Sequence, residues 1–392
     1  MKLNRSAIFY SVNIMFVFAM FTPMYIWGGA LLLQVFFYIS AICSIFFIKD
    51  VRVRFNGSVL LFVLWMMYVV AVSVAMEVDS KKLLVFLVLM LFSLYMLLLD
   101  ESKLVTVFDI FYNVVFIFAL LALLTWLLLA LDVVSLHSMY LLESYEPIKR
   151  EQGVFYYTNF VSNWMPQTNY CVNSFCASRL MGPLNEPGYW GTLVAMILAI
   201  KEMKPTPKNI IIFLSGVLTL SLAFFIMVFM YLLITLVRQK KLTLLIIVFS
   251  LFVFYLMGLF DGIIGYRLMG GSGVRDNRNT ELFLESFYLY LNDPLVFFGN
   301  GAFSSSDILN GSSSFLSVLY DVGIFGLVIF VVFHLSFIDK SFFKRHFVLH
   351  AVGFICIFSL SLYQRPYLLT PQYLFVYLSF VYSLRRKNEA KS

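Results

Sequence analysis

Long runs of apolar residues, separated by polar segments, dominate the chain. They lie near 7–22, 27–48, 58–76, 83–99, 107–131, 189–200, 209–237, 242–260, 313–338, 347–363 and 367–384. Most of them have about the 17–25 residues that a helix needs to cross roughly 30 Å of bilayer hydrocarbon. The pattern therefore predicts an all-α polytopic membrane protein.

The run over 209–237 is long for one crossing and short for two, and the distribution of charge helps to interpret it. Cytoplasmic loops of membrane proteins collect Lys and Arg. The segments that are rich in these residues here are 49–54, 201–208, 238–241, 340–345 and 385–391. All of them face the cytoplasm only if 209–237 forms a short hairpin that breaks near Leu218–Ser221. This topology has about 12 transmembrane helices (11 if the run is a single helix), with both termini cytoplasmic.

Two of the connecting segments are long, and both face outward in this topology. The chain then divides into five N-terminal transmembrane helices over 1–131, a long outer loop over 132–186, transmembrane helices with the short hairpin over 187–260, a second long outer loop over 261–312, and C-terminal transmembrane helices with a cytoplasmic tail over 313–392. We expect any chemistry outside the bilayer to lie in these two loops.

Composition agrees with this class of protein and narrows the chemistry. The chain is 61% hydrophobic and only 12% charged. The core of a soluble protein does not need so large a share of apolar residues. Its four histidines are scattered, and none has metal-ligand spacing to a cysteine, so we expect no metal and no cofactor. Cys171 and Cys176 in the first outer loop can form a disulfide on an oxidising face or remain two free thiols, and the sequence leaves both alternatives open.

The first candidate site is the stretch from Arg179 to Gly191, where the polar loop ends and an apolar helix begins. Pro187 suits the first helical turn, so Asn185 or Glu186 is the expected N-cap. A helix N-terminus attracts anions, and the guanidinium of Arg179 matches a phosphate. The stretch therefore predicts an anion site with the Glu186 carboxylate beside it. A capped membrane helix with an interfacial arginine has the same pattern, and this alternative stays open.

The second candidate site is a glycine-rich run in the second outer loop, with Arg267, Arg275 and Arg278. Three arginines on the outer face oppose the charge bias of membrane proteins, so a ligand explains them better than topology does. Local ion pairing, for example with Asp276, is the alternative. Nucleic acid is not an expected partner, because the arginines are few and face away from the cytoplasm.

Several segments in this order resemble a known family. The segments are Arg179 with Gly182-Pro-Leu-Asn-Glu186-Pro-Gly188 and Gly191, then Leu218-Thr-Leu-Ser221, Arg275 and Arg278, Pro294-Leu-Val-Phe-Phe-Gly299-Asn-Gly301, and Asp321-Val-Gly323-Ile-Phe-Gly326. Together they resemble Wzy-type O-antigen and capsule polysaccharide polymerases, within the O-antigen ligase and polymerase superfamily. The related ligases place a His-Asn pair shortly before the glycine that matches Gly323. This chain has Ser312 and Ser313 there, which favours a polymerase.

The resemblance implies a fold related to the glycosyltransferase C (GT-C) group and a metal-independent glycosyltransferase in the bacterial inner membrane. It implies an undecaprenyl-diphosphate-linked oligosaccharide as substrate, polymerised on the periplasmic face. A chain-length regulator and a flippase of the same pathway are expected partners, besides membrane lipid. An O-antigen ligase, a lipid-linked oligosaccharide flippase and a non-catalytic assembly subunit are the alternatives.

The expected roles follow from the charge that develops on a diphosphate leaving group. Arginines stabilise such charge without a metal. We therefore assign Arg179, Arg275 and Arg278, with Arg267 of the same run, to the diphosphate. Glu186 is the expected general base that takes the proton of the acceptor hydroxyl.

Overall fold

A computed structural model describes residues 5–21, 39, 56–131, 133–135, 140–143, 155–158, 162–164, 170–172, 175–177, 179–184, 186–238, 281–308, 315–338, 342, 348–364 and 371–389. Most of these residues are helical. The helices are α1 (Arg5–Met20), α4 (Gly57–Ala75), α5 (Ser80–Leu98), α6 (Glu101–Ala130), α8 (Pro187–Ile200), α9 (Pro207–Val217), α10 (Leu222–Arg238), α13 (Glu281–Leu291), α14 (Phe315–Leu335), α15 (Val348–Gln364) and α16 (Pro371–Glu389). Two short 3-10 helices, η4 (Pro294–Phe297) and η5 (Ser304–Asp307), lie between α13 and α14.

Several helices are apolar enough to lie in a bilayer. Within the described ranges, α4, α5, α6 and α14 are long and apolar enough to cross a membrane. Shorter apolar helices cover Pro187–Ile200, Pro207–Val217, Leu222–Thr235, Val348–Leu362 and the Ile8–Phe18 part of α1. The described residues therefore confirm a mostly helical chain with four helices apolar enough to span a membrane, which is compatible with the predicted polytopic membrane protein.

Side-chain caps fix where many of these helices begin. Asn56 accepts a hydrogen bond from the amide of Val59 at the start of α4, and Asp100 accepts one from the amide of Lys103 at the start of α6. Such caps satisfy amides that have no partner within the helix. Because Asp100 caps α6, this helix begins at Glu101, before the apolar run expected at 107–131.

The apolar run over 209–237 is divided between two helices. The helix α9 ends at Val217 and α10 begins at Leu222, so the non-helical chain covers the segment where the sequence predicts a break. Leu220 has a φ of 48°, a left-handed conformation that ends the helix. Thr219 and Ser221 in this segment are buried, so the break lies within protein.

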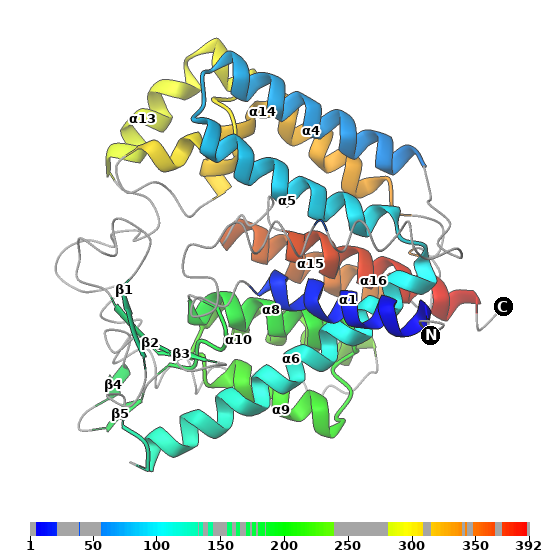
Figure 1. The fold of residues 1–392 in the computed structure, drawn as a ribbon, viewed down its shortest axis with the longest axis vertical. Coiled ribbons are helices and arrows are strands. Elements are labelled where there is room, and N and C mark those ends of the chain that lie inside the picture. Colours follow the sequence, from blue (N-terminus) through cyan, green and yellow to red (C-terminus); the bar gives the residue numbers. More distant parts are fainter. Residues whose placement is uncertain are drawn as a thin grey trace.

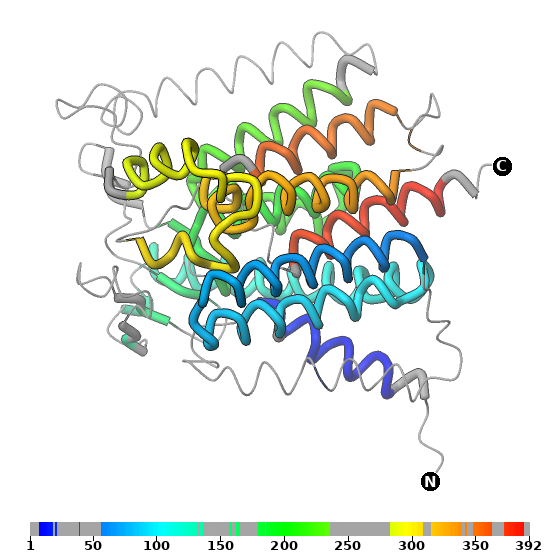
Figure 2. The backbone as a smooth tube through the Cα atoms, turned by 90° about the horizontal axis from the view of Figure 1, so that it is seen from above, coloured from blue at the N-terminus to red at the C-terminus, as the bar shows by residue number. Residues whose placement is uncertain are grey.

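The helices run side by side along one general direction (Figure 1). The strands and α13 lie at one end of the bundle, whereas the start of α1 and the end of α16 lie at the other end. Figure 2 agrees in a view turned by 90°. The described parts of both long loops therefore lie at the same end of the bundle, which we call the loop end.

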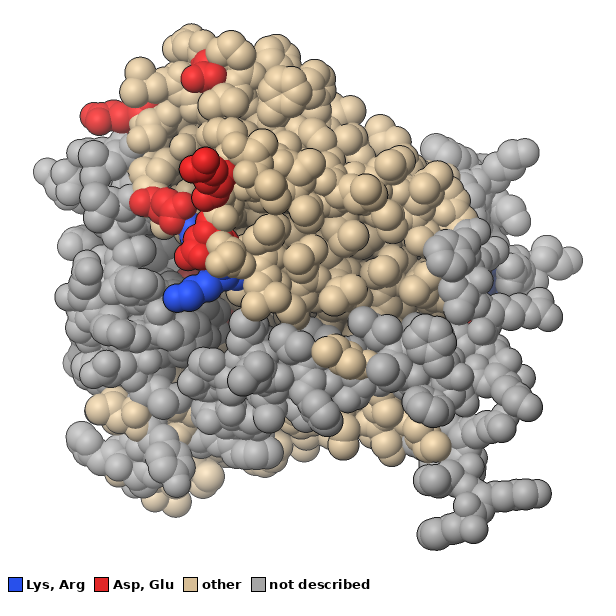
Figure 3. Space-filling model, turned by 45° about the horizontal axis from the view of Figure 1, so that its top comes forward, with Lys and Arg blue, Asp and Glu red and all other residues tan. Residues whose placement is uncertain are grey.

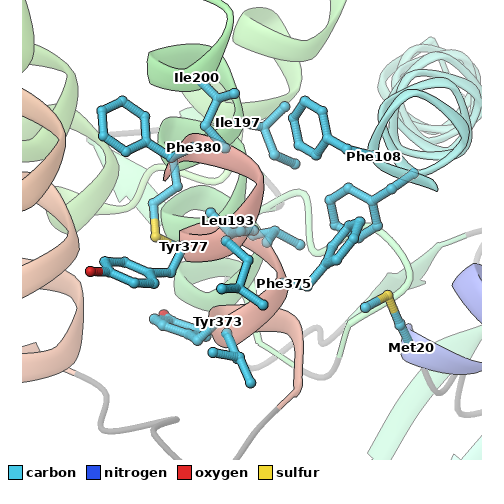
Figure 4. Packing of buried hydrophobic residues seen from close by; sticks show 14 of the residues in the cluster. Met20, Phe108, Leu193, Ile197, Ile200, Tyr373, Phe375, Tyr377 and Phe380 are labelled. Atoms are coloured by element: carbon cyan, nitrogen blue, oxygen red, sulfur yellow. The ribbon is translucent and has the colours of Figure 1, made fainter. Parts of the chain in front are cut away.

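The helix α8 is fully enclosed, because all 14 of its residues are buried. It contacts α9, α10, α15 and α16. In Figure 4, Leu193, Ile197 and Ile200 of α8 lie beside α16, and Phe375 of α16 points toward Phe108 of α6, with 6.1 Å between the ring centroids. A helix that is apolar on every face belongs in the core of a bundle.

Ion pairs join helices at the end opposite to the loop end. Arg385 of α16 bonds Glu101 at the start of α6 at 3.0 Å, and Lys387 bonds Glu202 in the turn after α8. Burial raises the pKa of Glu202, but the hydrogen bond and charge of Lys387 and the charge of Lys204 outweigh it, so the net pKa is lowered. Glu202 therefore remains a carboxylate at neutral pH and holds the end of α16 against the turn.

The first long loop contains β-structure, which an all-α prediction does not include. The strands β1 (Tyr140–Glu143), β2 (Phe155–Thr158) and β3 (Asn163–Trp164) form one antiparallel sheet, and β4 (Tyr170–Val172) pairs with β5 (Phe175–Ala177). These segments are rich in aromatic residues, which favour strands over helices. The all-α prediction missed these short strands because it was based on the long apolar runs, which make up most of the chain.

Candidate functional site

The start of α8 lies at the loop end and is built as the sequence predicts. Glu186 is the N-cap and Pro187 occupies the first turn. The Glu186 carbonyl accepts hydrogen bonds from the amides of Tyr189 (3.1 Å) and Trp190 (3.3 Å). The Glu186 side chain makes no capping bond, so its carboxylate does not cap the start of the helix.

Arg179 and Leu180 hydrogen-bond to the break between α9 and α10. The Nε of Arg179 donates to the carbonyl of Thr219 at 2.8 Å, and the amide of Leu180 donates to the carbonyl of Leu218 at 2.9 Å. A helix break inside a membrane leaves carbonyl groups that must find new partners within the protein. The end of the first long loop supplies two such partners, and this fixes Arg179 at the break.

The first turns of α8 pack against the same break. A Cβ added at Gly191 would lie 2.9 Å from Oγ1 of Thr219, and the indole Nε1 of Trp190 donates to Oγ of Ser215 at 3.2 Å. Gly182 packs on the Trp190 ring, because a Cβ there would lie 2.8 Å from it. The described residues between Arg179 and Gly191 therefore form one tightly packed unit with the α9–α10 break. We call this unit the α8 junction.

A strand of the first long loop holds the α8 junction from the other side. The amide of Asn163 donates to the carbonyl of Gly182 at 2.9 Å. Its side-chain Nδ2 donates to the carbonyls of Pro183 (3.3 Å) and Leu184 (3.0 Å). Asn163 is fully buried. The sheet is thereby attached to the segment that leads into Glu186.

A cluster of hydroxyl groups lies beside the first turns of α8. Tyr373 of α16 is 2.6 Å from Ser361 of α15 and 3.5 Å from Thr192 of α8, measured between the hydroxyl oxygens. The rings of Tyr189 and Tyr373 are 6.3 Å apart. All four side chains are buried, so polar groups continue from the α8 junction into the bundle.

The second long loop also attaches to a helix break, in α14. Gly323 has a φ of 67° and a ψ of 179° inside this helix, so the carbonyls before it lose their helical partners. Four of these carbonyls accept hydrogen bonds from outside the helix: Leu319 from the Tyr290 hydroxyl (3.0 Å), Tyr320 from the Asn300 amide (3.0 Å), Asp321 from the Gly301 amide (2.9 Å) and Val322 from the Tyr68 hydroxyl (3.4 Å). Each long loop is thus anchored by hydrogen bonds to a helix break.

The Asp321 carboxylate organises the turn at η5. It accepts hydrogen bonds from the amide (2.7 Å) and the hydroxyl (3.2 Å) of Ser305, and it is 5% exposed. Lys82 of α5 bonds the same turn through the Phe303 carbonyl (3.1 Å), the Ser306 hydroxyl (2.8 Å) and the Asp307 carboxylate. Asp321 therefore has a structural role, because its carboxylate joins η5 to α14.

Asp321→Ala is expected to lower the stability of the folded protein. The Ser305 amide and hydroxyl would be left buried without their acceptor, which costs about 1–3 kcal/mol. The measurement is the thermal unfolding of the purified full chain in detergent. Glu285→Ala, at an exposed carboxylate of α13, is the control and should change stability by less than about 0.5 kcal/mol. Equal stability of both variants would contradict the proposed role of Asp321.

Acidic side chains gather at one part of the molecule, beside a smaller number of basic ones (Figure 3). The exposed carboxylates of the α4–α5 turn, α13 and the segment after it are Glu77, Asp79, Glu285, Asp293 and Asp307. In the same region, burial raises the pKa of Tyr290, with Tyr320, Tyr68, Asp321 and Asp293 adding to the shift. Tyr290 therefore stays protonated and keeps its hydrogen bond to α14.

The predicted site residues fall into two groups. Arg179 and Glu186 both belong to the α8 junction, Arg179 through Thr219 and Glu186 through the first turn of α8. Arg267, Arg275 and Arg278 lie outside the described residues, as does Asn185. Cys171 and Cys176 are register partners in the β4–β5 pair, but their side chains lie outside the description.

Other residues of the site were not singled out by the sequence. Asn163 is one of several amides in a polar loop, and no motif distinguishes it. Thr219 belongs to the recognised break, but its role as the acceptor for Arg179 depends on three-dimensional contact. Ser361 and Tyr373 lie in apolar runs of the sequence. Their pairing across α15 and α16 becomes visible only in the structure.

Comparisons with protein-family models, with curated proteins and with solved structures find no match for this chain.

Proposed function

We propose that this chain is a polysaccharide polymerase of the bacterial inner membrane. It joins undecaprenyl-diphosphate-linked oligosaccharide units into an O-antigen or capsular polysaccharide on the periplasmic face. The proposal includes about 12 membrane crossings in a GT-C-like arrangement, with both termini cytoplasmic. The observation that carries it is the α8 junction, where a fixed arginine and a carboxylate lie at the start of a buried helix.

Arg179 is suited to bind the diphosphate of the lipid-linked substrate. Its Nε is held by the Thr219 carbonyl, which restricts the orientation of the guanidinium plane. The start of α8 adds a partial positive charge close to the same junction. Charge that is held in place before the reaction stabilises a departing diphosphate without further reorganisation. Arg275 and Arg278, with Arg267, complete this site in the proposal.

Glu186 is suited to act as the general base. The acceptor hydroxyl of one repeat unit attacks the anomeric carbon of the other chain and gives its proton to the Glu186 carboxylate. The new glycosidic C–O bond forms as the bond from the anomeric carbon to the diphosphate breaks, and undecaprenyl diphosphate leaves with the bonding electrons. An in-line attack inverts the anomeric centre. The Glu186 side chain is suited to this role because it is partly exposed at the start of α8.

The distribution of charge supports the α8 junction over the α13 side of the molecule. The exposed charged residues around α13 and the α4–α5 turn are mainly carboxylates. A diphosphate would be repelled by this surface at short range. Arg179 at the α8 junction offers a more favourable environment for an anion than this acidic surface does.

Arg179→Ala is expected to remove long glycan chains, because the loss of one preorganised donor costs about 100-fold to 1,000-fold in rate. Arg179→Lys keeps the charge but loses the planar fork, so we expect an intermediate loss. Lys81→Ala, at an exposed residue of α5, is the control and should leave chain length unchanged. The measurement is a glycan gel of a deletion strain that expresses each variant, with membrane abundance determined in parallel.

The same gel separates the proposed function from its alternatives. Loss of a polymerase leaves a single repeat unit on the surface, whereas loss of a ligase leaves long chains on the lipid carrier. Loss of a flippase leaves no processed repeat unit outside the membrane. Normal chain length in the deletion strain, or in Arg179→Ala at normal abundance, would contradict the assignment.

A further inference from the structure

Asn163 contacts three consecutive carbonyl groups shortly before Glu186. Its amide bonds Gly182 (2.9 Å), and its Nδ2 bonds Pro183 (3.3 Å) and Leu184 (3.0 Å). The contacts join β3 of the first long loop to a segment about twenty residues later in the sequence. This segment, residues 180–184, precedes α8, and we call it the lead of α8. One residue, through its backbone amide and its side chain, therefore fixes the backbone of this lead.

The orientation of the Asn163 amide follows from its surroundings. Two carbonyl oxygens face one end of the side-chain amide, and only the NH₂ group can donate to both of them. With the amide reversed, Oδ1 of Asn163 would face the carbonyl oxygens of Pro183 and Leu184, and none of these three atoms can donate a hydrogen bond. The Oδ1 atom is buried and has no hydrogen-bond partner among the described residues, so Asn163 is held by its donors.

The segment that Asn163 holds is also fixed on its other side. Leu180 bonds the Leu218 carbonyl, and Gly182 packs on the Trp190 ring. Leu180, Gly182 and Leu184 are buried, whereas Glu186 is partly exposed. The lead is therefore held between β3 and the α9–α10 break, and this sets where α8 begins and where the Glu186 carboxylate lies.

We propose that Asn163 is a positioning residue for Glu186, and that the sheet of the first long loop serves to hold the general base in place. The inference rests on the proposed function, because Glu186 must act as the base for its position to matter. Displacement of a catalytic group by about 1 Å lowers the rate by as much as 100-fold. Loss of the two side-chain donors of Asn163 would permit such a displacement.

The test is a double-mutant cycle between Asn163 and Glu186. The full-length chain is reconstituted in liposomes with the lipid-linked oligosaccharide extracted from cells that lack this chain, and the rate of chain extension is measured. We expect Asn163→Ala to lower the rate about 10-fold to 100-fold. In the Glu186→Gln background it should lower the rate by less than about twofold, because a residue that acts through Glu186 has no further effect once the base is lost.

Two further variants control for general damage to the fold. Asn163→Ser keeps one side-chain donor, and we expect a smaller loss than in Asn163→Ala. It also replaces Asn163→Ala in the cycle if the alanine variant does not reach normal abundance. Ser162→Ala changes an equally buried neighbour whose Oγ accepts from the Trp164 indole at 3.2 Å, and its rate should match the wild type.

The outcomes separate the inference from the proposed function. If Glu186→Gln loses activity but Asn163→Ala has the same effect in both backgrounds, the positioning role is wrong and the proposed base stands. A wild-type rate for Asn163→Ala leads to the same conclusion. If Glu186→Gln itself retains the wild-type rate, the proposed base is wrong and the inference about Asn163 falls with it.

Discussion

Glu186→Gln is expected to lower the rate of glycan extension by about 100-fold to 10,000-fold, the usual contribution of a general base. Glutamine has nearly the same shape but cannot take a proton from the acceptor hydroxyl. Because the Glu186 side chain makes no capping bond, α8 should still begin at the same residue. The loss should therefore appear in the turnover rate, with the affinity for the lipid-linked substrate little changed.

The measurement compares the rate of extension and the binding of the lipid-linked substrate for the wild type, Glu186→Gln and Glu285→Gln. Glu285 is an exposed carboxylate in α13, and its variant should behave as the wild type. Wild-type turnover in Glu186→Gln would exclude this residue from the reaction. Loss of substrate binding without loss of maximal turnover would assign it to binding instead.

Gly323→Ala is expected to prevent the accumulation of folded protein. The conformation of Gly323, with φ at 67° and ψ at 179°, is essentially restricted to glycine. An added Cβ would also lie 2.8 Å from the Phe297 carbonyl oxygen and 2.5 Å from the Phe298 carbonyl carbon. These are backbone atoms, so no rotamer change relieves the contact, and we expect a loss of more than about 3 kcal/mol.

The measurement is the abundance of the full chain in the membrane and its elution as a single species in mild detergent. Gly57→Ala is a matched control, because a Cβ at Gly57, the first residue of α4, has no atom within 4 Å. Alanine is the better helix former, so this variant should be at least as stable as the wild type. Normal abundance and elution of Gly323→Ala would show that the break in α14 is not required.

The helices could be predicted from the sequence because apolar periods and caps are local signals. The end of α9 and the start of α10 enclose Leu218–Ser221, the segment where charge bias predicted a break. The Glu186-Pro187 start of α8 followed in the same way from cap chemistry. The start of α8 depends on neighbouring residues alone, whereas the break was predicted from the distribution of charge along the whole chain.

Other features depend on contacts between distant residues. Gly323 lies in an apolar run, and nothing within that run shows that its helix is broken. The break is stabilised by the amides of Asn300 and Gly301, about twenty residues away, and by Tyr68 of α4. Asn163 likewise has a role only once β3 is placed beside Gly182. A single sequence does not contain these pairings.

The short length of α8 has a consequence for how a substrate would reach it. At 1.5 Å per residue, its 14 residues extend only about 21 Å, less than the roughly 30 Å hydrocarbon thickness of a bilayer. If its Lys201 end reaches one interface, Glu186 is sunk several ångströms beneath the opposite headgroups. In the proposed function, a polyprenyl carrier diffusing in that leaflet would then deliver its phosphates sideways, below the headgroups, where bulk water is scarce. Hydrolysis of the activated sugar would be suppressed there by depth alone.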